Sequence, residues 1–148
     1  MINYTDEDML DHDTVAAVIR NEVGDVLMQD HVKFGFWTLP VGKAKQGQAP
    51  IEGIKREIFE ECNLVIEKLK EIYCLEKVYD RDGKIVKCLI HVYDVLVHSG
   101  EMKNNEPDKH AEQKFLPVED IMRLPYVSDC TLMFLRGLGL ERGARLDG

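Results

Sequence analysis

Three glutamates lie close together near the end of a predicted helix. Glu57, Glu60 and Glu61 are spaced i, i+3 and i+4, which places them on one side of an α-helix. Like charges at this spacing repel one another, and at the C-terminal end of a helix they also oppose the macrodipole. A solvated acidic face is one interpretation. The other is a site for a hard divalent cation, because Mg²⁺ and Mn²⁺ prefer oxygen ligands.

The helix that would carry these acids is predicted over residues 50–62. Pro50 falls in its first turn, where proline is tolerated, and Asn63 can adopt the left-handed conformation that ends a helix. At 100° per residue, an apolar stripe runs beside the acids and predicts the buried face. The stripe consists of Ile51, Ile54, Ile58 and Cys62.

The sequence around this helix resembles the signature of the Nudix hydrolases, G-x5-E-x7-R-E-U-x-E-E-x-G-U, where U is a bulky aliphatic residue. Gly42 opens the pattern, REIFEE (56–61) forms its centre and Leu64 fills its last position, so seven of the nine specified positions match. FWTLPVGK upstream and HAEQKFLPVEDI downstream are also similar to the segments that flank the signature in the family. The resemblance therefore covers nearly the whole chain.

The resemblance implies an α+β fold, an α/β/α sandwich in which a central mixed β-sheet lies between helices. It implies a single Nudix hydrolase domain over residues 1–148, with an acidic N-terminal arm at 1–12 and a frayed tail at 143–148. The residue pattern predicts the elements independently. Strands are expected at 14–20, 26–29 and 114–117, a long hairpin at 64–79 and 84–98, a polar surface loop at 99–113, and helices at 118–123 and 128–137.

Three positions depart from the family pattern. Gln48 replaces a glutamate that usually supports the signature arginine, and a glutamine can still accept a hydrogen bond. Asn63 replaces a glycine, which is a mild change because asparagine tolerates positive φ. Val41 replaces the first glycine of a pair and keeps the backbone carbonyl that the family uses as a metal ligand. We interpret these changes as tuning, with reduced activity as the alternative.

The activity implied by the resemblance is hydrolysis of the pyrophosphate linkage in a nucleoside diphosphate joined to a group X, by metal-assisted attack of water. The cofactor would be Mg²⁺, with Mn²⁺ as a substitute. The expected metal ligands are Glu57, Glu60, Glu61 and the carbonyl of Val41. Arg56 is expected to hold Glu57 or Glu60 in place, because its planar fork suits a carboxylate.

The resemblance leaves the general base open between the signature and the loop before the last strand. Glu61 is the candidate from the signature, and Glu112 is the candidate from the loop, with Glu106 in reserve. A solvated acid in a polar loop is the alternative for either loop residue. The catalytic residues expected from the sequence are thus Glu61, Glu112 and Arg56.

Substrate-binding residues are expected outside the helix. Lys43 resembles a phosphate-contacting lysine of the family, although a surface lysine without a role is the alternative. Tyr126 and Asp129 lie where relatives that act on nucleotides contact the base, and Asp129 could instead be a helix cap.

The substrate expected first is a nucleoside triphosphate (NTP) or a modified NTP. Dinucleoside polyphosphates are an alternative, because Tyr79 lies about where their hydrolases keep a tyrosine. ADP-ribose or NADH is less favoured, since no proline occurs between Pro50 and Pro107, where ADP-ribose hydrolases typically carry one. A non-catalytic nucleotide-binding module is an alternative of another class, and Gln48 is its only support.

The composition of the chain limits which partners the protein can bind and where in the cell it is expected. The 148-residue chain has a net charge of −8, which argues against binding along polymeric nucleic acid. It contains neither a secretory signal nor an apolar run long enough to span a bilayer, so a cytoplasmic protein with no membrane association is expected. The resemblance leaves a homodimer open.

The cysteines and histidines show no metal-binding spacing. We expect the four cysteines to be buried and reduced, with an incidental disulfide between Cys74 and Cys88 as an alternative if they face each other in the hairpin. The five histidines form no spaced pair and are given no role.

Overall fold

The computed structural model describes residues 13–44, 48–81 and 83–142, and of the side chains at positions 79–81, 84 and 86 nothing is described. The predicted N-terminal arm at 1–12 and tail at 143–148 therefore lie outside the described residues. None of the helices in the described ranges combines the length and the apolar character that a transmembrane helix requires.

Within the described residues, four strands come first along the chain, followed by one helix, three further strands and two short helices. The strands are β1 (Asp13–Val18), β2 (Val26–His31), β3 (Phe36–Thr38), β4 (Val41–Ala44), β5 (Val65–Arg81), β6 (Lys84–Ser99) and β7 (His110–Leu116). The helices are α1 (Pro50–Cys62), α2 (Val118–Ile121) and α3 (Asp129–Gly137). The predicted helix at 50–62 and the predicted hairpin are confirmed.

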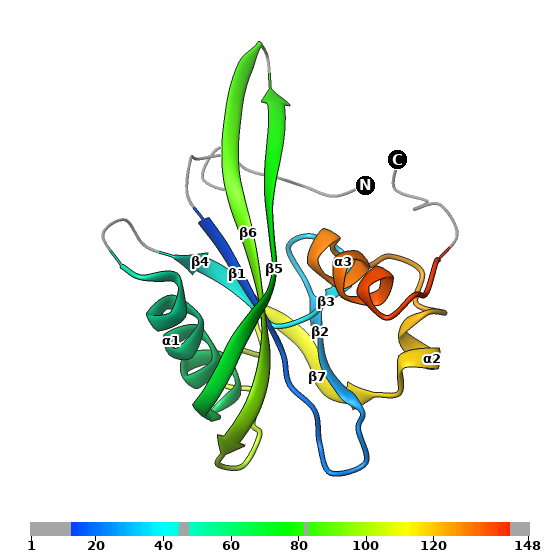
Figure 1. Ribbon diagram of the computed structural model, residues 1–148. Helices are drawn as coiled ribbons and strands as arrows, with labels where there is room; N and C mark the ends of the chain where they lie inside the picture. The colour runs from blue at the N-terminus through cyan, green and yellow to red at the C-terminus, as the bar shows by residue number, and fades with distance from the viewer. Residues whose placement is uncertain (1–12, 45–47, 82, 143–148) are drawn as a thin grey trace.

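The strands lie between α1 on one side and α2 and α3 on the other (Figure 1). A four-stranded sheet has the order β4-β1-β6-β5 and is mixed, because β1 pairs with β6 in parallel and with β4 in antiparallel. A three-stranded sheet has the order β3-β2-β7 and is antiparallel. The α+β sandwich is thus confirmed, although the strands form two sheets where one was expected.

Strand alternation divides the core into two clusters, one on each side of the four-stranded sheet. In β1, Val15 and Ala17 face α1, whereas Ala16 and Val18 face α3. The α1 cluster also contains Ile54, Ile58, Cys62, Leu64, Tyr93 and Val95, and the α3 cluster contains Met28, Leu39, Val92, Phe134 and Leu135.

Helix α1 packs through a face that differs from the predicted stripe at one position. Ile54, Ile58 and Cys62 are fully buried, as expected, but Ile51 is 47% exposed. Gly53 is the buried residue in this turn and lies against Ala44 of β4, so the backbones approach closely where no side chain intervenes. Asn63 ends the helix with φ 62°, in the left-handed conformation that was predicted.

The predicted surface loop at 99–113 is wrong in two respects. Strand β7 begins at His110 and takes up the last part of the predicted loop. The remaining part packs against the end of α1, where Lys103 N–H donates to the carbonyl of Cys62 and Asn105 N–H donates to that of Glu61. Carbonyls at a helix C-terminus lack partners within the helix, so this loop caps α1.

None of the four cysteines, all of which lie in the described ranges, forms a disulfide. Cys74 lies opposite His91 in the hairpin, and Cys88 lies opposite Lys77, so the two cysteines do not face each other as a disulfide would require. Cys62, Cys88 and Cys130 are buried as expected, whereas Cys74 is exposed.

The corrected packing of α1 predicts a contrast between two isoleucines. We expect Ile58→Ala to lower the free energy of unfolding by about 2–5 kcal/mol, because it leaves a cavity in the α1 cluster. Ile51→Ala should change it by less than about 0.5 kcal/mol. Urea unfolding followed by circular dichroism measures both, and equal losses would contradict the packing described for α1.

Candidate active site at the end of the acidic helix

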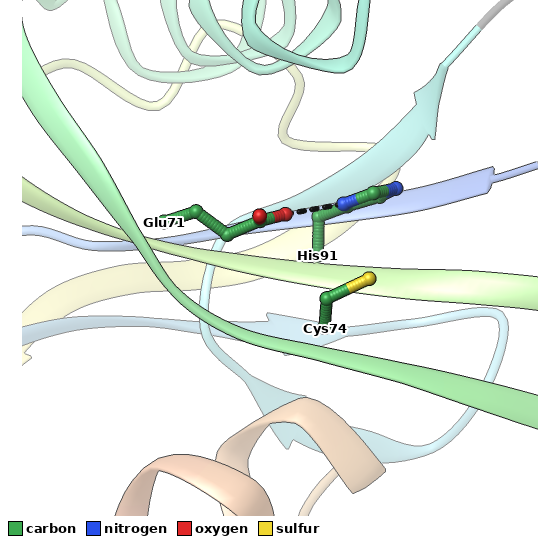
Figure 2. Close-up of side chains that lie close together, drawn as sticks. All are labelled: Glu71, Cys74 and His91. Carbon is green, nitrogen blue, oxygen red and sulfur yellow. Dashed lines mark hydrogen bonds and ion pairs between the residues drawn. The ribbon is translucent and has the colours of Figure 1, made fainter.

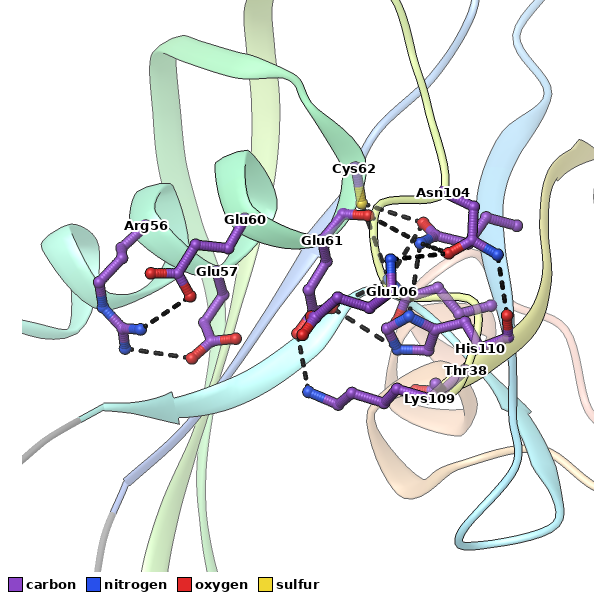
Figure 3. Close-up of polar contacts among 12 residues, drawn as sticks. Thr38, Arg56, Glu57, Glu60, Glu61, Cys62, Asn104, Glu106, Lys109 and His110 are labelled. Carbon is purple, nitrogen blue, oxygen red and sulfur yellow. Dashed lines mark hydrogen bonds and ion pairs between the residues drawn. The ribbon is translucent and has the colours of Figure 1, made fainter.

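The carboxylate of Glu61 is completely buried at the C-terminal end of α1. Its Oε1 accepts a hydrogen bond from Nε2 of Gln29 at 3.1 Å, and its Oε2 accepts one from Nζ of Lys109 at 3.0 Å (Figure 3). Glu61 is therefore not a solvated acid of the helix surface, and the cluster cannot be explained as a hydrated acidic face.

The two glutamines that surround Glu61 are cross-strand neighbours in β2 and β7. Gln29 pairs with Gln113 in the register, and Nε2 of Gln29 donates to Oε1 of Gln113 at 3.3 Å. Nε2 of Gln113 in turn donates to the backbone carbonyl of Glu61 at 2.9 Å. Neither glutamine was predicted from the sequence. The signal available was a polar residue within the otherwise apolar start of a strand, Val26 to Gln29.

Burial is the main electrostatic influence on Glu61. Desolvation, together with a hydrogen bond to Glu57, raises the pKa of Glu61 from 4.5 to about 8, although Lys109 and Gln29 act in the opposite direction. Two carboxyl groups this close favour a bound proton or cation between them. The oxygen ligands of Glu57 and Glu61 therefore fit a hard divalent ion.

His110 is a second buried group beside Glu61, and the sequence pattern gave it no role. It is fully buried, and its Nε2 lies 3.7 Å from Oε1 of Glu61. Its Nδ1 lies 3.4 Å from Nε2 of Gln113, and since an amide nitrogen can only donate, Nδ1 accepts and the ring proton belongs on Nε2. Burial, aided by His31 and Lys109, lowers the pKa of His110 to about 3, so the ring is neutral near pH 7.

Arg56 joins the other two signature glutamates. Its Nη2 lies 3.1 Å from Oε1 of Glu57, and its Nη1 donates to Oε2 of Glu60 at 3.3 Å (Figure 3). The predicted position of Arg56 beside these acids is confirmed. Glu57 is half-buried, whereas the side chain of Glu60 is 52% exposed.

Gly42 allows Glu57 to lie against β4. A Cβ atom at position 42 would be 2.4 Å from Cγ and 2.6 Å from Cδ of Glu57, which is closer than atoms can approach. The glycine that opens the signature is therefore required for the close approach of α1 to this strand.

Of the three positions that depart from the family pattern, Asn63 ends α1 as predicted, whereas Gln48 does not form the predicted hydrogen bond. Oε1 of Gln48 is buried and has no hydrogen-bond partner among the described residues, so the expected bond to Arg56 is not formed. The side chain of Val41 packs against the α3 cluster. Lys43 is half-buried in β4. Because successive side chains of a strand point to opposite faces, the side chain of Lys43 leaves β4 on the face opposite to Gly42 and Glu57.

The two loop glutamates have different environments. Glu112 is exposed and pairs with Lys114 at 3.2 Å, on the face of β7 opposite to Gln113. Glu106 is half-buried. Burial and the charge of Glu61 raise the pKa of Cys62, and against burial Glu61 and Glu57 raise that of Lys109; Glu106 adds to both shifts. The structure therefore brings Glu106, and not Glu112, into the surroundings of Glu61 (Figure 3).

Tyr126 and Asp129 lie at the start of α3, on the other side of the strands from α1 (Figure 1). The carbonyl of Tyr126 accepts from Trp37 N–H, and Oδ2 of Asp129 lies 3.2 Å from Nζ of Lys77. The N-cap of α3 is Ser128, whose side chain accepts from Thr131 N–H, so Asp129 is not the cap. The structure therefore does not bring Tyr126 and Asp129 together with the acidic cluster of α1.

Comparison with known proteins agrees with this fold. A "Nucleoside triphosphate pyrophosphatase/Nudix hydrolase fusion protein" from Bifidobacterium longum is 26% identical over 107 residues, which are 70% of this chain. The chain spans only about a fifth (21%) of the length of that relative.

Solved structures match over most of their length. A MutT NUDIX hydrolase from Burkholderia pseudomallei has a TM-score of 0.72 at 24% identity, covering 84% of this chain and 95% of its own. The NUDIX domain of Shewanella oneidensis NrtR, solved with ADP ribose, has a TM-score of 0.68 at 16% identity, covering 93% and 92%. The NUDIX domain profile matches residues 10–130, and the chain therefore belongs to the Nudix family.

Proposed function

We propose that this protein is a Mg²⁺-dependent pyrophosphohydrolase that cleaves the pyrophosphate linkage of a nucleoside diphosphate joined to a group X. The observation that carries the proposal is the completely buried carboxylate of Glu61 at the end of α1, which accepts hydrogen bonds from Gln29 and Lys109. An acid in this position destabilises the metal-free protein, and a function that requires it accounts for its presence.

Glu57 and Glu61 would hold the ion, with Glu60 as a third ligand and the carbonyl of Val41 as a fourth. A divalent ion bound there neutralises phosphate charge and lowers the pKa of an attacking water. Arg56 fixes Glu57 and Glu60 through its two terminal nitrogens. Mn²⁺ would substitute for Mg²⁺, since both prefer oxygen ligands.

The loop before β7 supplies the remaining groups. Glu106 is our candidate for the general base, because it is the loop carboxylate that lies near Glu61. The ammonium group of Lys109 donates to Oε2 of Glu61. If a divalent ion bound this oxygen, the ammonium group would be close enough to contact a phosphate of the substrate. We also propose Lys43 as a second contact to the substrate phosphates, and Tyr126 and Asp129 as contacts to the nucleobase.

For the substrate we favour an NTP or a modified NTP. The absence of proline between Pro50 and Pro107 argues against the pattern typical of ADP-ribose hydrolases in the family. Dinucleoside polyphosphates remain the alternative substrates. The net charge of −8 favours a small nucleotide over polymeric nucleic acid, and four cysteines without a disulfide fit a cytoplasmic location.

A nucleotide-binding module without turnover is the second candidate. It is favoured by Gln48, whose Oε1 does not support Arg56 as the family glutamate does. The NrtR domain was solved with ADP ribose, so at least one protein of this fold binds such a ligand. An enzyme consumes its substrate in the presence of Mg²⁺, whereas a binding module releases the ligand intact.

Turnover should depend on Glu61. With Mg²⁺ and a panel of NTPs, modified NTPs, ADP-ribose, NADH and diadenosine polyphosphates, we expect Glu61→Gln to lower kcat by about 100- to 10,000-fold. Glu52→Gln, in the first turn of the same helix, is the matched control and should retain activity. Ion-exchange chromatography identifies the products. Absence of turnover in the wild type with either Mg²⁺ or Mn²⁺ would favour the binding module.

Stability of the metal-free protein should depend on pH through Glu61. Because its pKa rises from an ordinary value of 4.5 to about 8 in the folded protein, the folded state keeps a proton that the unfolded state has lost between these values. Stability is therefore lost as pH rises through this window.

The substitution Glu61→Gln removes the contribution of Glu61 to the pH dependence of stability and leaves the contributions of the other titrating groups. In EDTA, we expect the Tm of Glu61→Gln relative to wild type to increase from about pH 5 to about pH 9. Differential scanning calorimetry at both pH values measures this difference. A Tm difference that is the same at both values would contradict the raised pKa.

The two loop glutamates provide a test of the general base. Glu106→Gln should lower kcat by about 100-fold or more and leave KM nearly unchanged, because a base acts on the attacking water. Glu112→Gln should retain kcat, since Glu112 faces solvent beside Lys114. If Glu112→Gln gives the larger loss, the loop must rearrange when substrate binds.

A further inference from the structure

A second group of ligand-forming side chains lies on the β5–β6 hairpin, outside the acidic cluster. One ligand atom from each of Glu71, Cys74 and His91 lies within 4.8 Å of the others (Figure 2). His91 is only 9% exposed, whereas Glu71 and Cys74 are reached by solvent. A carboxylate, a thiol and an imidazole together form the ligand set of a transition-metal site.

A β-bulge brings these three side chains to one face of the sheet. Residues three apart in a regular strand point to opposite faces, so Glu71 and Cys74 would be separated. The register shifts between Glu71 and Tyr73, so that Glu71 lies opposite Tyr93 while Cys74 lies opposite His91. Because Tyr93 and His91 share a face of β6, both ligands of β5 point to that face. Bulges commonly re-aim side chains in this way.

The imidazole of His91 is held between two carboxylates. Its Nε2 lies 3.0 Å from Oδ2 of Asp13 at the start of β1, and its Nδ1 hydrogen-bonds to Oε1 of Glu71. Because both partners are carboxylates, both ring nitrogens donate, and against the opposing effect of burial these hydrogen bonds raise the pKa of His91. When Nδ1 gives up its proton, its lone pair points toward Glu71 and Cys74 while Nε2 still donates to Asp13. Metal-binding histidines are commonly oriented by a carboxylate on the other ring nitrogen, and Asp13 is placed for this role.

We propose that Glu71, Cys74 and His91 form a binding site for Zn²⁺ or a similar borderline transition-metal ion, oriented by Asp13. Tetrahedral Zn²⁺ places its ligand atoms about 3.3–3.8 Å apart. The cluster has to contract to reach this size, and the two ligands that would move, Glu71 and Cys74, are exposed. The site leaves a fourth position for water or another ligand.

Metal binding at this cluster releases protons. The thiol proton of Cys74 leaves when the sulfur becomes a ligand, and so does any proton held between Nδ1 of His91 and Glu71. The thiolate ligand distinguishes this site chemically from the site proposed at α1, where all ligands are oxygen atoms that suit Mg²⁺. A bound ion would also join the base of the hairpin to the start of β1, through Asp13.

Co²⁺ reports on the site through the charge-transfer absorption of a cobalt–thiolate bond. We expect this band when Co²⁺ is added with excess Mg²⁺, which occupies oxygen-only sites, and we expect Zn²⁺ to abolish it by displacement. Cys74→Ser and His91→Gln should both remove the band. Asp13→Asn should keep it while weakening Zn²⁺ binding in calorimetry by about 10- to 100-fold.

Matched variants control for the other cysteines and acids. Cys62→Ser, next to Glu61, and Cys88→Ser, on the other face of the hairpin, should keep the band, as should Glu76→Gln on β5. Circular dichroism in EDTA verifies that each variant is folded. Absence of the band in the wild type, or its persistence in Cys74→Ser, would overturn the proposal, and neither result would bear on pyrophosphate hydrolysis.

Discussion

Burial of the Glu61 carboxylate at the negative end of α1 is the constraint on which the site depends. Both the helix dipole and desolvation disfavour a charge in this position, and the pKa of Glu61 is raised to about 8. The surrounding residues compensate through hydrogen bonds from Gln29 and Lys109. The elements that meet here, α1, β2 and β7, are therefore held together by polar contacts to one carboxylate as well as by their apolar faces.

The loop before β7 has two roles that depend on each other. Its backbone N–H groups cap the C-terminal carbonyls of α1, and this capping places Glu106, Lys109 and His110 around the end of the helix. A catalytic group on a loop requires such anchoring, because an unanchored loop cannot hold a side chain to the accuracy that proton transfer requires. Changes in the capping residues would therefore affect catalysis without touching substrate.

Local signals in the sequence were sufficient for the helix, the hairpin and the acidic cluster. Pro50, Asn63 and the spacing of the apolar residues defined α1, and the signature spacing identified the acids and Arg56. Gln29, His110 and Gln113 were not predicted, because they meet Glu61 only through the pairing of β2 with β7, which no short-range pattern reveals. Glu112 was preferred to Glu106 because it matches the position of the loop glutamate in the family best. The sequence does not show that the pairing of β7 with β2 places Glu112 on the face opposite to Gln113. Ile51 was assigned to the buried face because a helical wheel does not show that Gly53 takes the contact with β4.

We infer that the buried carboxylate of Glu61 binds a divalent ion, and that in the metal-free protein Lys109 pairs with this carboxylate in place of the ion. The most direct measurement is a crystal structure of the protein with Mn²⁺, with an anomalous difference map. We predict an anomalous peak bound by Glu57 and Glu61, with Nζ of Lys109 displaced from Oε2. An intact ion pair between Lys109 and Glu61, with no anomalous peak beside α1 at saturating Mn²⁺, would contradict this inference.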